Sequence, residues 1–526
     1  MLKFTCCDAL AQFSAAQGAN GLRGITRGFE KECLRVDAQA HLAQTRHPQA
    51  LGSKLTHPWI TTDYSEALLE FITPPSTDPH FPLAFLQDIH RYTAQQLARQ
   101  GEVMWAASMP GLLGDDKDIP LADYGSSNKA KFKHVYREGL GLRYGRQMQT
   151  IAGVHYNWSL PDEFWTTLYG CCSATGSRQD FISDRYFGLI RNFLRYSWLI
   201  PYLFGASPAV NTSFLHGRKT DLLALGDDTL YGPYATSLRM SDLGYQNRVQ
   251  TNLNISFNTM TDYARGLDEA IHTVDPFYQA LGVVDNGQWK QLNANILQIE
   301  NEFYGGIRPK RIGKLGERPA LALQRYGVEY VEMRLFDLNP LIDIGIAPEQ
   351  RPFADMFLLM CLLRDSPPIT SREQSENDEN KRRIVSRGRQ PDLQLLVHNT
   401  EQAFRPLAHE LFDDMLPFAA VLDNAYGTCA QANSYTATLA TLRKRIEAPE
   451  TTPSAIVLAG AHEYGGLIPY TLHLSQQHQA QLLGQPLTRE LTAKLDASVA
   501  ASLQEQADLE AQPQGSFEDY VAAYYA

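Results

Sequence analysis

Acidic side chains recur in short segments whose patterning could place them on one surface. In residues 29–33, Glu30 and Glu32 fall on one face of an extended chain and Lys31 on the other, and in residues 69–71 Glu70 points away from two apolar neighbours. Carboxylates that crowd together repel one another unless cations lie among them. Hard divalent ions such as Mg²⁺ prefer oxygen ligands and also bind phosphates. The acidic set comprises Glu30, Glu32, Asp63, Glu66, Glu70 and Glu332, joined by His155.

Basic residues that suit phosphate accompany this set. Arg334 shares a face with Glu332 in residues 328–336, and Arg308, Lys310 and Arg311 lie within residues 305–311. The planar guanidinium of arginine matches the oxygens of phosphate or carboxylate. Because the sequence contains no GxxxxGK[ST] loop and no GxGxxG after a strand, we disfavour a P-loop kinase and a Rossmann enzyme. Spacing alone leaves metal-dependent phosphoryl transfer and a structural role both open.

Strands with one polar face are predicted to position these residues. The segments 151–159, 251–258 and 328–336 alternate with period two, and their polar faces carry Asn, Ser, His, Glu and Arg. The simpler interpretation is a solvated face, because antiparallel sheets often have one wet side. Runs of Asn, Ser and His, however, are poor strand formers and good ligands, and Gly153 allows a close approach to the backbone. We predict a sheet whose apolar face packs on helices and whose polar, concave face is the floor of a substrate site.

Composition narrows the class of protein. The 526 residues include 47 basic and 58 acidic side chains, a net charge of −11, which gives no broad field for nucleic acid or an anionic membrane. Seven cysteines without CxxC spacing indicate unpaired thiols in a reducing compartment. The uncharged segment 196–215 is interrupted by Pro201, Gly205 and Pro208, so we predict a buried helix ending near Ile200, followed by a core loop. With no secretory signal pattern, we expect a cytoplasmic protein.

Two regions are predicted along the chain. Residues 1–390 form a catalytic body and residues 391–526 a mainly helical C-terminal region packed on it. The polar stretch 371–389 is predicted as a surface loop or the start of a helix between them. Beyond residue 391, Leu393, Leu396, Phe404 and Leu411 recur at roughly helical spacing, and residues 488–510 are rich in helix formers. Because no catalytic pattern occurs there, we interpret this region as a structural cap.

Several motifs resemble those of one family. Residues 27–35, RGFEKECLR, resemble the opening motif of the bacterial single-chain glutamate–cysteine ligases. Other segments match that family in order and spacing from about residue 20 to residue 345, and the similarity is weak beyond about residue 430. Each motif alone is modest evidence, but together they are specific. The matching segments are 51–57, 59–63, 66–74, 124–128, 136–140, 153–157, 201–208, 237–245, 298–302, 307–310, 329–334 and 337–340.

The resemblance implies a fold and a reaction. The fold would be α+β and similar to that of glutamine synthetase, with a curved, mainly antiparallel sheet forming a funnel-shaped active site, helices outside and a helical C-terminal region. The reaction would join the γ-carboxylate of L-glutamate to the amine of L-cysteine through a γ-glutamyl phosphate, with ATP and more than one Mg²⁺, as the first step of glutathione biosynthesis. We expect a monomer without nucleic-acid or membrane partners, and feedback by glutathione is left open.

The resemblance also implies residue roles, carried over by motif position. Arg334 matches the arginine near the transferred phosphate and, with Glu332, is the expected catalytic pair. Tyr64 stands where a relative has Phe, which makes the pocket edge more polar, and Phe336 replaces a smaller residue, which affects local packing. The implied metal ligands or close neighbours are Glu30, Glu32, Asp63, Glu70, His155 and Glu332. The implied ATP-binding residues are Arg308, Lys310, Arg311 and Arg334, and the implied substrate-binding residues are Tyr64, Tyr136, Leu140, Gln149, Arg239 and Tyr245.

Three rival functions remain open. The first is another ATP-dependent carboxylate–amine ligase that uses a different amine. The second is a metal-dependent hydrolase, because carboxylates and histidine also build such sites. The third is a protein that binds glutathione or an amino acid without catalysis. Phosphate release measured with glutamate, with and without cysteine and Mg²⁺, discriminates among them.

Overall fold

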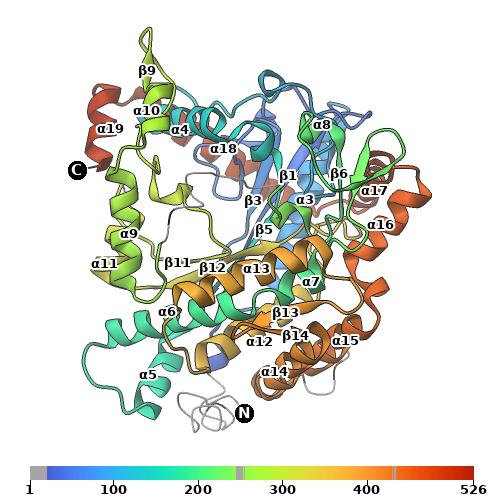
Figure 1. Cartoon of the computed structure of the whole chain (residues 1–526). Helices are drawn as coiled ribbons and strands as arrows, with labels where there is room; N and C mark the ends of the chain where they lie inside the picture. Colours follow the sequence, from blue (N-terminus) through green and yellow to red (C-terminus); the bar gives the residue numbers. More distant parts are fainter. Residues whose placement is uncertain are drawn as a thin grey trace.

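The central element is a seven-stranded antiparallel sheet with the order β11-β12-β5-β1-β3-β2, in which β4 also pairs with β1 (Figure 1). The computed structural model describes residue 13 and residues 21–243, 253, 255–314, 316–428, 431 and 434–525. The strands of the main sheet are β1 Thr26–Val36, β2 Ile60–Thr62, β3 Leu68–Ile72, β4 Val103–Met104, β5 Val154–Ser159, β11 Ile307–Lys310 and β12 Tyr330–Phe336. Smaller sheets are formed by β6 Ala209–Asn211, β7 Leu223–Leu225 and β8 Thr229–Tyr231, by β9 Val284–Asp285 and β10 Gln288–Trp289, and by a hairpin near residue 400.

Alternation along the strands separates an apolar face from a polar one. In β1 the side chains of Phe29, Lys31 and Cys33 are buried against helix α3 (Phe81–Ala98), which runs behind the sheet, while Glu30 and Glu32 point the other way. Lys31 Nζ lies 2.8 Å from the ring nitrogen of His90 on α3. A side chain on the polar face is therefore positioned by its strand, and the helices behind the sheet hold that strand in place.

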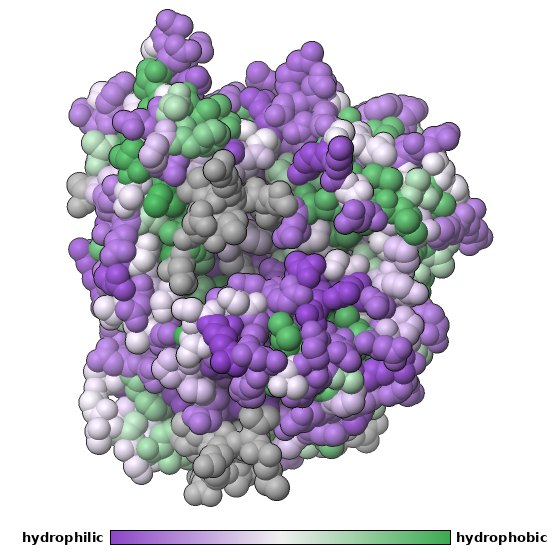
Figure 2. All heavy atoms as spheres, in the orientation of Figure 1, coloured by the Kyte–Doolittle hydropathy of each residue, from purple (hydrophilic) through white to green (hydrophobic). Residues whose placement is uncertain are grey.

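Helices surround the sheet on its other sides (Figure 1). Every residue of α12 is buried, and this helix packs against α6, α14 and α15. The helix α13 is polar along most of its length and gives the strongly hydrophilic band at the centre of the surface in Figure 2. Besides α3, the α-helices that the structure describes before residue 390 are α4 Asn128–Tyr144, α5 Asp162–Cys171, α6 Arg178–Tyr196, α7 Leu199–Phe204, α8 Thr212–Leu215, α9 Met260–His272, α10 Pro276–Leu281, α11 Pro319–Tyr326, α12 Gln350–Leu363 and α13 Ser371–Arg387.

The region after residue 390 is joined closely to the rest. A single connected hydrophobic core includes residues from Leu22 to Leu495, and α17 packs on α3 and β4. The predicted domain boundary at residue 390 stays a prediction. The elements of this region are β13 Gln394–Val397, β14 Thr400–Ala403, α14 Phe404–Tyr426, α15 Tyr435–Glu447, α16 Pro453–Glu463, α17 Leu467–Leu483, α18 Arg489–Ala511 and α19 Phe517–Tyr525.

A buried ion-pair network ties the sheet to these helices. Asp355 of α12 accepts hydrogen bonds from Arg27 of β1 at 2.9 and 3.0 Å and from Arg351 at 3.1 Å. Tyr156 of β5 and Tyr435 of α15 donate to the same carboxylate at 2.7 and 2.9 Å. Burial alone would raise the pKa of Asp355, but the two arginines hold it below its ordinary value. Donors from four elements, β1, β5, α12 and α15, thus contact this buried charge.

Three local predictions differ from the structure. Residues 253 and 255–258 lie in no strand, and the other residues of the predicted strand 251–258 are outside the described residues. Leu393 and Leu396 were predicted to be helical, but Leu393 lies just before the β13–β14 hairpin and Leu396 lies within it. Short apolar runs fit the helical and the strand periodicity equally well. The chain after α6 continues into α7, which ends at Phe204 rather than near Ile200. Of the two alternatives for residues 371–389, a loop or the start of a helix, the structure has a complete helix, α13, and the helix predicted over residues 488–510 is confirmed. Within the described residues, no helix combines the length and the apolar character that crossing a bilayer requires.

Candidate active site

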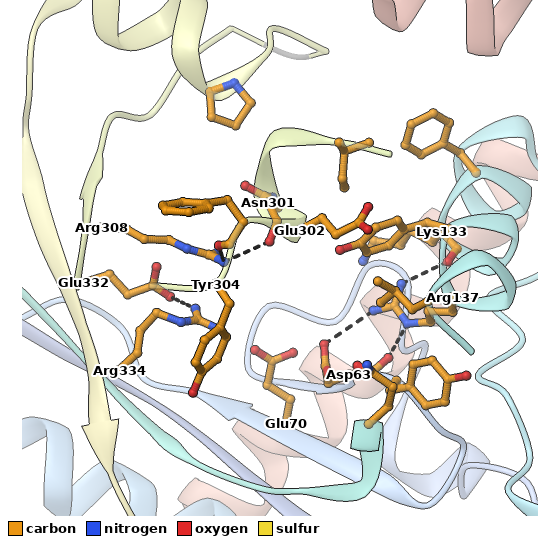
Figure 3. Close-up of a pocket in the computed structure, with 18 of the residues that line it drawn as sticks. Asp63, Glu70, Lys133, Arg137, Asn301, Glu302, Tyr304, Arg308, Glu332 and Arg334 are labelled. Carbon is orange, nitrogen blue, oxygen red and sulfur yellow. Dashed lines mark hydrogen bonds and ion pairs between the residues drawn. The ribbon is translucent and has the colours of Figure 1, made fainter. Parts of the chain in front are cut away.

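A cavity of about 1150 Å³ lies between the polar face of the sheet and helix α4. Figure 3 shows Arg308, Glu332 and Arg334 on one side of it, Lys133 and Arg137 on the other, and Asp63 and Glu70 between them. Its volume is slightly above the range of about 300–1,000 Å³ that is typical of single small-molecule sites, which suits more than one ligand at once. The predicted site residues that line this cavity are Glu30, Glu32, Asp63, Tyr64, Glu70, Tyr136, Leu140, Gln149, His155, Arg308, Lys310, Glu332 and Arg334.

Three of these residues form a cluster that could hold a metal ion. Glu30, His155 and Glu332 each offer a ligand atom, and these atoms lie within 4.8 Å of one another. The strand register brings them together, because Glu30 of β1 stands opposite His155 of β5 and Glu332 of β12 stands opposite the next polar residue of β5, Asn157. His155 Nδ1 is 3.1 Å from Glu30 and 3.4 Å from Glu332, and Asn157 donates to Glu30 at 2.9 Å. Two carboxylates and an imidazole form a donor set that suits a divalent cation.

Basic side chains also surround Glu332, one of the two carboxylates of this cluster. Glu332 accepts a hydrogen bond from Arg334 at 2.8 Å and pairs with Lys310 at 3.1 Å. Burial would raise the pKa of Glu332, but Lys310, Arg334 and His155 hold it well below its ordinary value. Arg308 lies opposite Glu332 across the β11–β12 register and donates to the carbonyl of Asn301 at 2.9 Å and to that of Phe303. This side of the cavity is therefore fitted to bind the oxygens of a phosphate beside a metal.

A second acidic group faces the cavity from β1, β3 and the turn between β2 and β3. Glu32 and Glu70 are paired across the register of β1 and β3, and Asp63 lies directly after β2. Burial, together with the charges of Asp63, Glu30 and Glu32, raises the pKa of Glu70 well above its ordinary value. Burial also raises the pKa of Glu32, whose carboxylate accepts the Gly153 backbone N–H at 2.7 Å. These carboxylates repel one another, and cations among them would relieve the repulsion.

Helix α4 provides a wall that the sequence reasoning found only in part. Tyr136 and Leu140 were predicted as substrate-binding residues, but the basic residues Lys133 and Arg137 were not. Arg137 is 3.7 Å from Asp63. Burial and the nearby Arg137 lower the pKa of Lys133 to about 8. Lys133, Tyr136, Arg137 and Leu140 are spaced by three or four residues, as on one face of a helix. This spacing could have identified the cavity-facing side of α4 from the sequence.

Three predicted site residues are not placed in the cavity. Arg311 points away from it, pairs with Glu329 at 3.8 Å and lies over the ring of Tyr326. Arg239 is buried over Gly153, on the side of the sheet that carries His155, where it donates to the carbonyl of Arg334 at 3.2 Å; it is not among the residues that line the cavity. Tyr245 lies outside the described residues. The motif placed Arg311 beside the site but not in it. Successive residues at the end of a strand point to opposite sides, so Arg311 points away when Lys310 faces the cavity.

Arg239 also explains a glycine on the sheet floor. A Cβ at Gly153 would lie 2.0 Å from the guanidinium of Arg239, so a side chain at residue 153 would displace that arginine. The guanidinium is 3.6 Å from the buried carboxylate of Asp337, which also accepts hydrogen bonds from Ser207 at 2.5 Å and Ser237 at 2.9 Å. Arg239 is therefore held over Gly153 by its own network.

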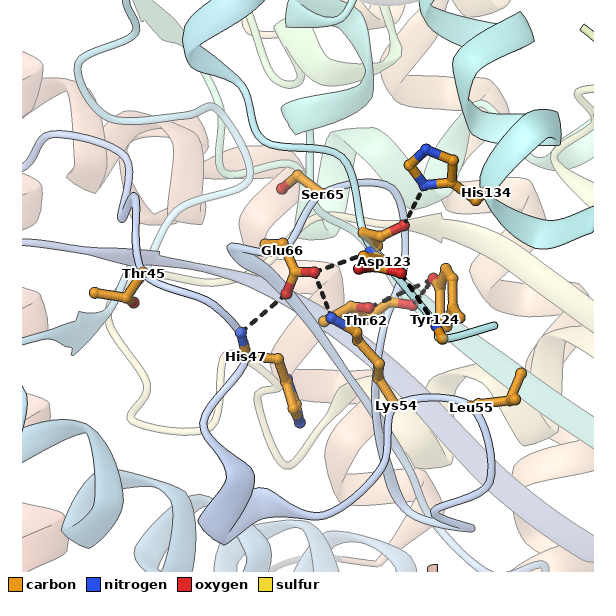
Figure 4. Close-up of polar contacts among 12 residues, drawn as sticks. Thr45, His47, Lys54, Leu55, Thr62, Ser65, Glu66, Asp123, Tyr124 and His134 are labelled. Atoms are coloured by element: carbon orange, nitrogen blue, oxygen red, sulfur yellow. Dashed lines mark hydrogen bonds and ion pairs between the residues drawn. The ribbon is translucent and has the colours of Figure 1, made fainter. Parts of the chain in front are cut away.

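Glu66 belongs to the acidic set but has a structural role. Its buried carboxylate pairs with Lys54 and accepts the backbone N–H groups of His47 at 2.9 Å and Asp123 at 2.8 Å (Figure 4). It does not line the cavity. The network connects three loops beside the β2–β3 turn and so fixes the turn that carries Asp63 and Tyr64.

Residues from distant segments complete the cavity. Glu302 lines it and accepts hydrogen bonds from Tyr144 and from Arg143, the latter at 3.2 Å. Tyr520 and Tyr524, on the last helix α19, line it as well. The C-terminal region, interpreted from the sequence as a structural cap, therefore contributes to the wall of the cavity. No pattern in its sequence marked those tyrosines.

Comparisons with known proteins agree on one family. The family model described as glutamate–cysteine ligase matches residues 10–384. A glutamate–cysteine ligase from Alcanivorax borkumensis is 49% identical over 516 residues, which are 97% of each chain. The crystal structure of glutamate–cysteine ligase from Francisella tularensis in complex with AMP has a TM-score of 0.89 at 35% identity, covering 95% of this chain and 97% of that one. A bifunctional glutathione synthetase from Pasteurella multocida has a TM-score of 0.71 at 25% identity, and the match covers 91% of this chain and 55% of that one.

Proposed function

The chain belongs to the glutamate–cysteine ligase family, and from this membership we propose how its cavity divides the work of the reaction. The enzyme joins the γ-carboxylate of L-glutamate to the amine of L-cysteine at the expense of ATP, the first step of glutathione synthesis. For the architecture, we propose that the polar face of the sheet and α4 form the funnel of a glutamine-synthetase-like ligase. The antiparallel sheet with helices outside supports this proposal.

Divalent cations are proposed to lie among the carboxylates. Glu30, His155 and Glu332 would hold one ion, and the second acidic group, Glu32, Asp63 and Glu70, lies ready for another. The donor chemistry fits Mg²⁺, because these carboxylate oxygens face one cavity and their mutual repulsion is relieved by positive charge. When bound, the ions would neutralise charge on the phosphates of ATP. The cluster of three convergent ligand atoms is the observation that carries this part of the proposal.

Phosphoryl transfer is proposed to occur beside Arg334. A carboxylate is a poor electrophile at neutral pH, so an oxygen of the glutamate γ-carboxylate first attacks the terminal phosphorus of ATP and ADP leaves. Such a step asks the protein mainly for alignment and for neutralisation of charge. Arg334 and Arg308 would bind oxygens of the moving group, and Lys310 and Arg334 hold Glu332 ionised. The product of this step is γ-glutamyl phosphate.

The amine of cysteine is proposed to attack that acyl phosphate from the α4 side. The new C–N bond forms, phosphate leaves, and the amine loses its proton. The cysteine side of the cavity would be lined by Tyr64, Tyr136, Leu140 and Gln149. Arg239 would act from its place over Gly153, and Tyr245 is kept as a predicted member of this pocket. Substitution of Arg239 is then expected to impair cysteine use more than ATP use.

One assay tests the proposal against its rivals. Release of ADP and phosphate is measured with ATP and Mg²⁺, with glutamate alone, and with glutamate plus cysteine or a panel of other amines. A ligase of this specificity releases ADP at full rate with cysteine. Turnover without ATP would indicate a hydrolase, preference for another amine would indicate a related ligase, and binding without ADP release would indicate a non-catalytic protein. The monomeric state stays a prediction, and feedback by glutathione stays open.

A further inference from the structure

The motif segment 124–128 contributes no side chain to the lining of the cavity, yet its first residue, Tyr124, contacts two residues that do. Tyr124 is buried. The Lys133 ammonium lies 4.9 Å from the centre of its ring, and the Arg137 guanidinium lies 4.7 Å from it. Both cations belong to the wall that α4 provides, opposite the arginines of β11 and β12 (Figure 3). One buried ring therefore contacts two basic groups of that wall.

The position of Tyr124 is fixed by hydrogen bonds to several elements. Its hydroxyl, as donor, lies 2.7 Å from the carbonyl oxygens of both Thr62 and Asp63 at the end of β2 (Figure 4). Its own carbonyl accepts a hydrogen bond from Gln506 of α18 at 3.2 Å. The ring belongs to a small buried cluster with Leu55, Ala122 and Ala130. The fold, rather than the two cations, thus determines where this ring lies.

An aromatic ring holds a cation without neutralising it. The negative face of the ring attracts the positive group, whereas a carboxylate at the same place would form an ion pair and compete with the oxygens of a ligand. Among the described residues, no carboxylate forms an ion pair with Lys133, and the carboxylate of Asp63 is 3.7 Å from Arg137. The charge of the Lys133 ammonium is therefore left available to an anion in the cavity.

The two cations need such a support. Their positive charges repel each other, because both lie within 5 Å of the centre of one ring. The side chain of lysine is long and flexible, and it loses conformational freedom when it is held in one direction. A ring that attracts both groups offsets the repulsion and the loss of freedom before any ligand binds. Removing the ring should therefore let these side chains turn away from the cavity.

We propose that Tyr124 is a positioning residue, whose ring keeps the Lys133 ammonium and the Arg137 guanidinium turned toward the cavity to meet an anionic group of a bound ligand. This inference rests on the proposed function, because it assumes that anionic substrates occupy the cavity. A carboxylate of glutamate or cysteine and a phosphate of ATP share the required chemistry, and the experiment distinguishes these sources. Tyr124 itself touches no substrate and acts only through its two neighbours.

A double-mutant cycle between Tyr124 and Lys133 tests the assignment. The value of kcat/KM is measured for glutamate, cysteine and ATP in turn, with Tyr124→Leu, Lys133→Met and both together. Tyr124→Leu should lower kcat/KM roughly five- to tenfold, the scale of a cation–π contact in a desolvated site, for the substrates that Lys133→Met also affects. Because the ring acts through the cation, the double variant should lose clearly less than the product of the two single losses.

Two changes at residue 124 separate the electrostatic role of the ring from its shape. Tyr124→Phe keeps the negative face of the ring and should retain kcat/KM within about threefold. Trifluorophenylalanine at the same position fills similar space, but its fluorine atoms withdraw charge from the ring face, so it should lose as much as Tyr124→Leu. The matched control is Tyr196→Leu, which removes a ring 4.6 Å from the guanidinium of Arg364, where neither residue lines the cavity. It should change kcat/KM less than about twofold.

Other outcomes overturn the proposal. Single losses that multiply fully in the double variant, or a loss confined to a substrate that Lys133→Met leaves unaffected, would show that Tyr124 does not act through Lys133. Equal activity of the phenylalanine and trifluorophenylalanine enzymes would show that only the shape of the ring matters, and this comparison decides the question even if Tyr124→Leu fails to fold. An equal loss in Tyr196→Leu would show a general effect of lost packing. Failure of the unaltered enzyme to release ADP with glutamate and cysteine would instead refute the proposed function.

Discussion

Replacing Glu332 by glutamine tests the centre of the proposed mechanism. This carboxylate is 1% exposed and makes contacts of 2.8 Å with Arg334, 3.1 Å with Lys310 and 3.4 Å with His155. The substitution keeps the shape of the side chain but removes the negative charge, so three basic groups are left facing one another and one metal ligand is weakened. Loss of one main electrostatic group in a preorganised site typically costs 10²–10³ in kcat. We therefore expect turnover to fall at least ~100-fold, equivalent to about 2.7 kcal/mol of transition-state stabilisation.

The assay is ADP release at saturating glutamate, cysteine and ATP, repeated over a range of Mg²⁺ concentrations. Glu329→Gln is a matched control, because Glu329 lies just before the same strand and pairs with Arg311 outside the cavity. It should keep turnover within about twofold, as surface ion pairs contribute little. Both variants are checked by circular dichroism and thermal unfolding. A correctly folded Glu332→Gln enzyme with near-normal turnover would refute the assignment of Glu332, and equal losses in both variants would show that the effect is not specific to the site.

Three further substitutions test other parts of the structure. Arg308→Ala should raise the KM for ATP at least about tenfold, the scale of a lost charge-assisted hydrogen bond, whereas Arg311→Ala should change it less than about twofold; the reverse order in initial-rate kinetics would contradict the placement of these residues. Tyr64→Phe should raise the free energy of unfolding in urea by about 1 kcal/mol, because the buried Tyr64 hydroxyl has no hydrogen-bond partner among the described residues, and a loss of stability would reveal a partner. Asp355→Asn should cost about 3–5 kcal/mol, since it leaves buried arginines unneutralised. The pKa of Asp355 is depressed in the folded state, so this carboxylate stabilises the fold at neutral pH and the stabilisation is lost as the pH falls below about 4. The free energy of unfolding of Asp355→Asn should therefore fall less steeply in acid than that of the unaltered protein.

The strand pattern around the carboxylates could be predicted because it is local. Side chains alternate with period two in any strand, so Glu30 and Glu32 had to share a face once residues 26–36 were extended. The same rule applied to Glu332 and Arg334. The same pattern failed to predict the structure of residues 253 and 255–258, which alternate but form no strand. Periodicity cannot show whether a partner strand is present.

The sequence by itself determined which faces are polar and, through its motifs, which family and reaction to expect. Only the tertiary structure decided which polar residues meet. The register of β1, β5 and β12 brings Glu30, His155 and Glu332 within 4.8 Å, while Glu66, which belongs to the same acidic set, is turned into a structural network. The tyrosines of α19 reach the cavity from almost two hundred residues beyond β12. Local dihedral preferences extend over a few residues, but strand neighbours and helix docking depend on packing of the whole core, and no short window of sequence contains that information.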